Sequence, residues 1–100
     1  MFDLHPPEVI CRTLGERVRA LRLARNLSQQ ELADMGGVSL STLRRFEASG
    51  QGSTQMLVQI AQALGAADGL QNLFAPSIRS IADAERAERA AQRQRARRRG

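Results

Sequence analysis

The chain has 100 residues, a formal net charge of +5 and a single cysteine, Cys11. That length allows one small domain with tails, and one cysteine excludes an internal disulfide and a cysteine-pair metal site. No apolar run approaches the roughly 18–20 residues that span a bilayer, and the acidic, proline-interrupted N-terminus does not resemble a signal peptide. We therefore expect a cytoplasmic protein with no membrane contact, no metal and no cofactor.

The excess positive charge is confined to the C-terminal end of the chain. Residues 1–77 contain seven arginines and seven acidic residues, whereas residues 78–100 contain eight arginines and three acidic residues. The chain has no lysine. Arginine suits bidentate contacts to phosphate or guanine, although a biased genome composition explains the absence of lysine equally well.

Residues 1–12 are expected to form an N-terminal arm, in which Pro7 could begin a short helix. The first firm helix start is Thr13, because Thr13 and Glu16 have the spacing of a capping box. A stripe of apolar residues at helical spacing follows. Asn26 is the expected left-handed residue that ends this helix. The stripe consists of Leu14, Val18 and Leu21.

Residues 28–47 predict two short helices joined by a glycine turn. Ser28 and Glu31 have the spacing of a second capping box, and Ser39 is a favourable N-cap for the second helix. Gly37 can take the positive φ of such a turn at no steric cost. The two expected helices cover residues 29–35 and 40–48.

Two further helices are expected after a loop at residues 49–53. The first covers residues 54–64, and Gly65 ends it. Asp68 begins a short helix, and Pro76 ends the domain. The apolar residues of this last segment are expected to face inward. They are Leu70, Leu73 and Phe74.

Residues 77–100 form an arginine-rich tail. After Ile81 no apolar side chain is larger than that of alanine, so we expect either a solvated helix or a disordered segment. The tail could clamp DNA phosphates without sequence preference, bind an acidic partner protein, or act as a solubilising extension. The expected organisation is an all-α fold with an arm at residues 1–12, a domain at residues 13–76 and this tail.

Four segments carry a family resemblance. They are Leu-Ser-Gln-Gln-Glu-Leu-Ala at 27–33, Gly-Val-Ser at 37–39, Thr-Leu-Arg-Arg-Phe-Glu at 42–47 and Ile-Ala-Gln-Ala-Leu-Gly at 60–65. Residues 14–74 thereby resemble the DNA-binding domain of the Cro/C1-type (lambda-repressor-like, XRE) helix-turn-helix family. The resemblance implies a compact five-helix domain that binds double-stranded DNA, mostly as a dimer. Gly36 departs from the family, which has alanine or a larger apolar residue there, and predicts a loosely packed helix end.

The helix at residues 39–48 is the expected reading element, because this motif places its second helix in the DNA major groove. Arg44 and Arg45 offer paired donors for guanine, whereas outside such a motif an arginine pair is simply a solvated helix face. Leu40 could pack on a thymine methyl, and the resemblance implies phosphate and base contacts for Gln29. The expected DNA-binding residues are Gln29, Gln30, Ser39, Leu40, Ser41, Thr42, Arg44, Arg45 and Ser49.

The resemblance also implies two structural roles. Arg22 is expected to form an ion pair with Glu47, and Met56 and Leu57 lie where the family dimerises. We expect no catalytic residue and no enzyme activity, because His5 is the only histidine and the carboxylates are scattered.

The resulting interpretation is a bacterial or phage-encoded repressor that binds a palindromic operator as a homodimer. An alternative is an antitoxin or adaptor that neutralises a kinase-type toxin and regulates its own operon. An RNA-binding protein led by the basic tail is a third class.

Overall fold

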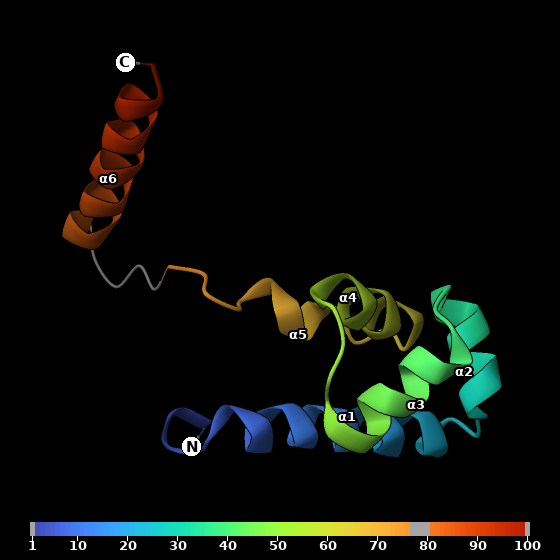
Figure 1. Cartoon of the computed structure of the whole chain (residues 1–100). Coiled ribbons are helices and arrows are strands. Elements are labelled where there is room, and N and C mark those ends of the chain that lie inside the picture. Colours follow the sequence, from blue (N-terminus) through green and yellow to red (C-terminus); the bar gives the residue numbers. More distant parts are fainter. Residues whose placement is uncertain (1, 77–80, 100) are drawn as a thin grey trace. The chain divides into compact units, whose positions relative to one another are not determined.

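The computed structural model describes residues 2–76 and 81–99, and all regular structure in these ranges is helical (Figure 1). The all-α expectation is therefore confirmed. The chain divides into two units, the first reaching Leu70 and the second starting at Gln71. The elements are the 3-10 helix η1 (Phe2–Leu4) and the α-helices α1 (Pro7–Ala24), α2 (Gln29–Gly36), α3 (Leu40–Ser49), α4 (Thr54–Ala63), α5 (Asp68–Gln71) and α6 (Ile81–Arg99).

Helix α1 begins six residues before the expected position. Pro7 occupies its first turn, where proline is tolerated because the missing N–H has no intrahelical partner. The Thr13 hydroxyl does not cap a helix but donates to the carbonyl of Val9 at 2.9 Å, inside the continuous helix. The expected helix start at Thr13 is therefore wrong, and most of the expected arm is helical. The helix ends at Ala24, and Asn26 is the left-handed residue after it, as predicted, with a φ of 56°.

Helices α2 and α3 begin at the caps that the sequence predicts. The Ser28 hydroxyl accepts from the Glu31 N–H, and the Glu31 carboxylate accepts from the Ser28 N–H, each at 3.0 Å. The bond from the Ser28 backbone is the main reason that the pKa of Glu31 lies below its usual range. Because this pKa is lowered in the folded protein, the cap is complete at neutral pH and weakens as the pH falls through it. Gly37 has the expected positive φ of 70°.

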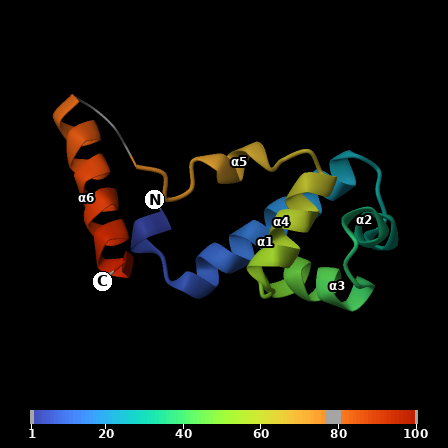
Figure 2. The same cartoon turned by 90° about the horizontal axis from the view of Figure 1, so that it is seen from above.

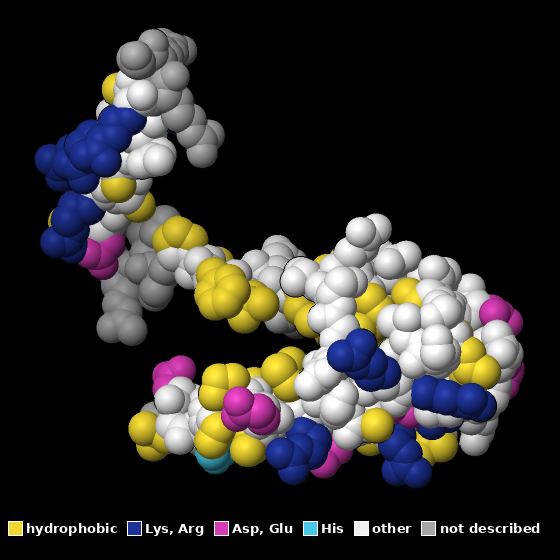
Figure 3. All heavy atoms as spheres, in the orientation of Figure 1, with side chains coloured by type: hydrophobic (Ala, Val, Ile, Leu, Met, Phe, Trp, Pro, Cys, Tyr) yellow, Lys and Arg dark blue, Asp and Glu magenta, His cyan; other side chains and the backbone are white. Residues whose placement is uncertain are grey.

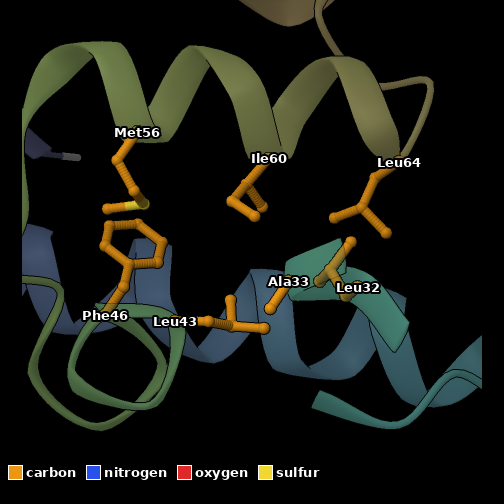
Figure 4. Close-up of a cluster of buried hydrophobic side chains, with 7 residues drawn as sticks. All are labelled: Leu32, Ala33, Leu43, Phe46, Met56, Ile60 and Leu64. Atoms are coloured by element: carbon orange, nitrogen blue, oxygen red, sulfur yellow. The ribbon is translucent and has the colours of Figure 1, made fainter. Parts of the chain in front are cut away.

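The core of the first unit lies between α2, α3 and α4, where each helix contributes its buried face (Figure 4). Burial of each large apolar side chain stabilises the fold by about 1.5–3 kcal/mol. Three residues of α1 pack against this cluster from one side, namely Leu14, Val18 and Leu21. The buried members of the cluster are Leu32, Ala33, Leu43, Phe46, Met56, Ile60 and Leu64.

Met56 belongs to this core rather than to a surface. It is only 4% exposed, and Figure 4 shows its side chain beside the Phe46 ring. Met56 therefore has little surface to offer a second chain, contrary to the dimer contact expected for it. Its neighbour Leu57 is half-buried.

Helices α1 and α3 approach each other backbone to backbone. A Cβ atom on Gly15 would lie 2.2 Å from the carbonyl oxygen of Phe46, and one on Gly50 would lie 1.9 Å from that of Cys11. No side chain fits at either position without moving the backbone. These two glycines therefore set the spacing between α1 and the far end of α3.

The end of α2 is closely packed, contrary to the expectation from Gly36. A Cβ atom there would lie 2.9 Å from the Cδ1 atom of Ile60 in α4. The Gly36 carbonyl also accepts from the Gln59 side chain at 3.2 Å. Glycine allows α2 and α4 to approach closely here. The low helix propensity of Gly36 therefore occurs at a position where the absence of a side chain permits packing.

The segment after α4 differs in part from the prediction. Gly65 follows α4 with a φ of 66°, as expected, and the expected short helix from Asp68 is α5, with four residues. The side chains after it differ from the prediction. Leu73 and Phe74 are 58% and 94% exposed, so the expectation that they face inward is wrong. Of the two alternatives for the tail, a solvated helix or a disordered segment, the structure has the helix, α6. Among the described helices none is long and apolar enough to cross a membrane.

We predict that Gly15→Ala lowers the free energy of unfolding by roughly 1–3 kcal/mol, because the new methyl group must displace the α3 backbone. Gly69→Ala is the matched control, since nothing lies within 4 Å of its Cβ position. The control should be neutral or stabilising by about 0.5–1 kcal/mol. Urea denaturation of both variants measures the difference, and equal stabilities would contradict the close approach.

Candidate nucleic-acid interface

The turn between α2 and α3 fixes the angle between the two helices. The Val38 N–H donates to the carbonyl of Ala33 at 3.0 Å, which closes the end of α2 around the left-handed Gly37. Ala33 itself has no exposed surface, because α2 and α3 meet there. Figures 1 and 2 show α2 and α3 side by side at one end of the first unit.

Helix α3 has one buried and one exposed face. Leu43, Phe46 and Glu47 are buried, whereas Arg44 and Arg45 are exposed on the other side. Both arginines therefore extend from a helix whose opposite face is held in the core. Figure 3 shows arginine side chains spaced over the face formed by α1 and α3.

The hydroxyl groups at the start of α3 serve mainly to cap it. The Ser39 oxygen accepts from the Thr42 N–H at 3.1 Å and donates to the Thr42 hydroxyl at 2.6 Å. Ser41 is exposed and Leu40 is half-buried. The Ser41 hydroxyl lies 3.2 Å from that of Ser39, and Ser41 takes no part in the backbone cap.

The other expected contacts lie at two separate places. Gln30, on α2, is exposed and donates to Asp34 in its own helix at 2.9 Å. Ser49 lies at the end of α3, where its hydroxyl donates to the Arg45 carbonyl at 2.9 Å. The Arg45 guanidinium donates to the Gln51 side chain at 2.8 Å. Ser49 and Gln51 therefore support the C-terminal end of α3.

A buried ion pair joins α1 to α3. The Nε and Nη2 atoms of Arg22 donate to the two carboxylate oxygens of Glu47 at 2.7 and 3.0 Å. The remaining Nη1 donates to the Leu27 carbonyl at 2.8 Å, so the same side chain also holds the connection between α1 and α2. The two residues are only 7% and 6% exposed. The hydrogen bond with Glu47 raises the pKa of Arg22 above its ordinary value.

Gln29 extends this pair to the exposed face of α3. Its Nε2 atom donates to Glu47 at 3.2 Å, and its Oε1 atom accepts from Nε of Arg44 at 3.3 Å. A hollow of about 160 Å³ lies beside these side chains and is lined by Arg19, Gln29, Arg44, Glu47 and Ala48.

Arg19 is the residue of this hollow that the sequence analysis missed. It is exposed on α1 and lies three positions before Arg22, hence on the neighbouring part of the same helix surface. Once Arg22 is paired with α3, Arg19 must also lie near α3. That spacing is the signal that could have identified it.

A model of the helix-turn-helix family matches residues 18–67, which is half of the chain. The chain therefore belongs to the Cro/C1-type, or XRE-type, helix-turn-helix family. It is a DNA-binding protein of the transcription-regulator kind. The matched span contains the ion pair and all of the expected DNA-binding residues. No curated protein matches the chain.

We predict that Arg22→Ala and Glu47→Ala each lower the free energy of unfolding by about 3–5 kcal/mol, because each leaves an unpaired buried charge. Arg19→Ala removes a neighbouring arginine that is exposed, and should change stability by no more than about 0.5 kcal/mol. Thermal and urea denaturation measure all three. Equal melting temperatures in the three variants would contradict a structural role for the pair.

Proposed function

We propose that the protein is a transcriptional repressor that reads a palindromic operator with α3 as a homodimer in the bacterial cytoplasm. The observation that supports this most is the exposed pair Arg44 and Arg45 on a helix whose other face is buried. Two capped helices joined at Gly37 have the arrangement that directs the second helix into the major groove.

Within this proposal the two arginines read guanines through paired N–H donors, and Ser41 reaches a base or a phosphate. Leu40 packs on a thymine methyl group. The start of α2 lies beside the DNA backbone, where its free N–H groups favour phosphate. Gln29 and Gln30 are the first two residues of that helix.

A homodimer follows from the small footprint of a single α3, which covers only a few base pairs. Two copies place their reading helices about 34 Å apart, or roughly 10 base pairs. The exposed part of Leu57, on α4, is available for this contact. Met56 is not part of the proposed interface because it is buried in its own chain.

Selection of bound sequences from a random DNA pool tests this proposal. We predict an inverted repeat with half-sites about 10 base pairs apart. Arg44→Ala should weaken binding by roughly 1–3 kcal/mol and relax the preference at one position of each half-site. Arg25→Ala is the control, because the exposed Arg25 lies beside the end of α4. Sites without inverted symmetry would contradict the dimer, and an unchanged preference would contradict Arg44 as a reader.

We also propose that α6 binds DNA phosphates without sequence preference. Four of its arginines follow one another at spacings of three and four residues, which places them on one face of a helix. Figure 3 shows basic side chains along one side of α6. Arg86 pairs with Asp83, and Arg89 lies 4.0 Å from Glu85. The second half of the helix carries the uncompensated charge. The four arginines are Arg86, Arg89, Arg93 and Arg97.

A second candidate, an antitoxin that holds a partner protein, is favoured by a different observation. Leu73, Phe74 and Ile81 are all more than half exposed, and side chains of this kind are typical of protein contacts. In this case the second unit binds a toxin, while α3 still binds the operon's own promoter.

Salt titrations distinguish the two roles of the second unit. If α6 binds phosphates, Arg93→Ala/Arg97→Ala should flatten the dependence of log K on log salt by about one unit per lost contact. Base preference should stay the same, because phosphate contacts carry no direct sequence information. Parallel slopes for the variant and the unaltered protein would eliminate the phosphate role and favour the partner-binding role.

A further inference from the structure

We propose that Gln29 is a positioning residue that sets the orientation of Arg44 for base recognition. This inference rests on the proposed function, in which Arg44 reads the major groove. It extends the role of the buried ion pair from stability to sequence preference. Hydrogen bonds lead outward from the buried pair through Gln29 to the exposed guanidinium group of Arg44.

The first step is the fixed position of the Glu47 carboxylate. Arg22 donates to both of its oxygens, and the Oε1 atom also accepts from Gln29. An ionised carboxylate only accepts hydrogen bonds. Gln29 must therefore present its NH₂ group to Glu47, and its amide cannot be turned over without placing two oxygens against each other.

The second step is the direction of the Gln29 carbonyl. With its NH₂ group on Glu47, the carbonyl oxygen lies toward Arg44 and accepts from Nε at 3.3 Å. The reversed amide would instead set its NH₂ group against a cation that only donates. Both ends of the Gln29 amide therefore favour the same orientation. The Glu47 carboxylate sets this orientation because it accepts only from the NH₂ group.

The third step concerns the donors that Arg44 keeps for DNA. Within the described part of the chain, its side chain makes one hydrogen bond, through Nε. The Nη1 and Nη2 groups form the end-on pair that matches O6 and N7 of guanine. An arginine held at Nε loses fewer rotamers when it binds than an unrestrained one. The bond to Gln29 thus leaves the reading end of Arg44 available.

The hollow beside Arg44 makes this single hydrogen bond important. About 160 Å³ of open space adjoins Arg44 and Gln29, and Arg44 is exposed. Side-chain packing therefore restrains the guanidinium group little on this side. The orientation of Arg44 depends on the contact with Gln29.

Two neighbouring residues provide matched controls. Gln30 follows Gln29 in α2 but donates to Asp34 in the same helix. Arg45 follows Arg44 in α3 but donates to Gln51. Neither Gln30 nor Arg45 contacts the buried ion pair. Neither should therefore link the position of that pair to the orientation of a reading arginine.

A double-mutant cycle on the selected operator tests the proposal. Gln29→Ala should weaken binding about threefold to tenfold in the unaltered protein, and less than about twofold when Arg44→Ala is already present. It should also reduce the preference for guanine at the position that Arg44 reads. Cycles of Gln30→Ala with Arg44→Ala, and of Gln29→Ala with Arg45→Ala, should be additive.

A contribution of Gln29 through its own phosphate contact gives a different result. It lowers affinity by the same factor in both backgrounds and leaves base preference unchanged, and that outcome overturns the proposal. The cycle is interpretable because Gln29→Ala places a good helix former at the first residue of α2, and circular dichroism verifies that each variant is folded.

A measurement without DNA separates this proposal from the proposed function. In the free protein, Gln29→Ala should shift the Nε–Hε resonance of Arg44 and speed its exchange with water, whereas Gln30→Ala should change neither. An unaffected resonance overturns the proposal that Gln29 holds Arg44, whatever the protein binds. Failure of the selection to yield any preferred duplex contradicts the proposed function. The Arg44 Nε–Hε resonance still reports on the hydrogen bond between Gln29 and Arg44.

Discussion

The buried ion pair between Arg22 and Glu47 is the contact on which the arrangement of the first unit depends. Two charges in a low-dielectric interior are costly unless each has its partner in good geometry. Arg22 also holds the Leu27 carbonyl, and Glu47 also accepts from Gln29. One pair therefore fixes α1, the α1–α2 connection, the start of α2 and the C-terminal part of α3 relative to one another.

The glycines set a second, purely steric constraint. Gly15 and Gly50 allow the backbones of α1 and α3 to approach, and Gly36 allows α2 to approach α4. At Gly15 and Gly50 a side chain would meet backbone atoms, so α3 lies close against α1 and buries the face that carries Leu43 and Phe46. The face with Arg44 and Arg45 is exposed as a consequence of the packing, and the same packing that stabilises the fold presents the reading side chains.

The sequence predicted the elements whose signals are local. The caps at Ser28 and Ser39 and the left-handed Gly37 depend on residues within a few positions, and all three have the predicted geometry. The Thr13 signature was misleading, because its hydroxyl bonds within a longer helix that Pro7 had already started. A local pattern shows where a helix can begin, but not whether the residue already lies inside a helix that began earlier in the chain.

Predictions that needed tertiary information were less successful. Gly36 has a low helix propensity, but only its approach to the Ile60 side chain shows that this end of α2 is closely packed. Met56 and Phe74 are both apolar, yet one is buried against Phe46 and the other is 94% exposed. The link from Glu47 to Arg44 runs through Gln29 of α2, and no local spacing places Gln29 beside α3, so only the fold reveals it.

The central claim, that α3 and the start of α2 form the DNA-binding surface, is tested most directly by nuclear magnetic resonance. Isotope-labelled protein is titrated with the duplex obtained by selection, and the change in each backbone amide signal is mapped onto the structure. We predict the largest changes at residues 29–30 and 39–45, with small changes along the buried face of α4. Changes confined to α6, with α3 unaffected, would contradict the account.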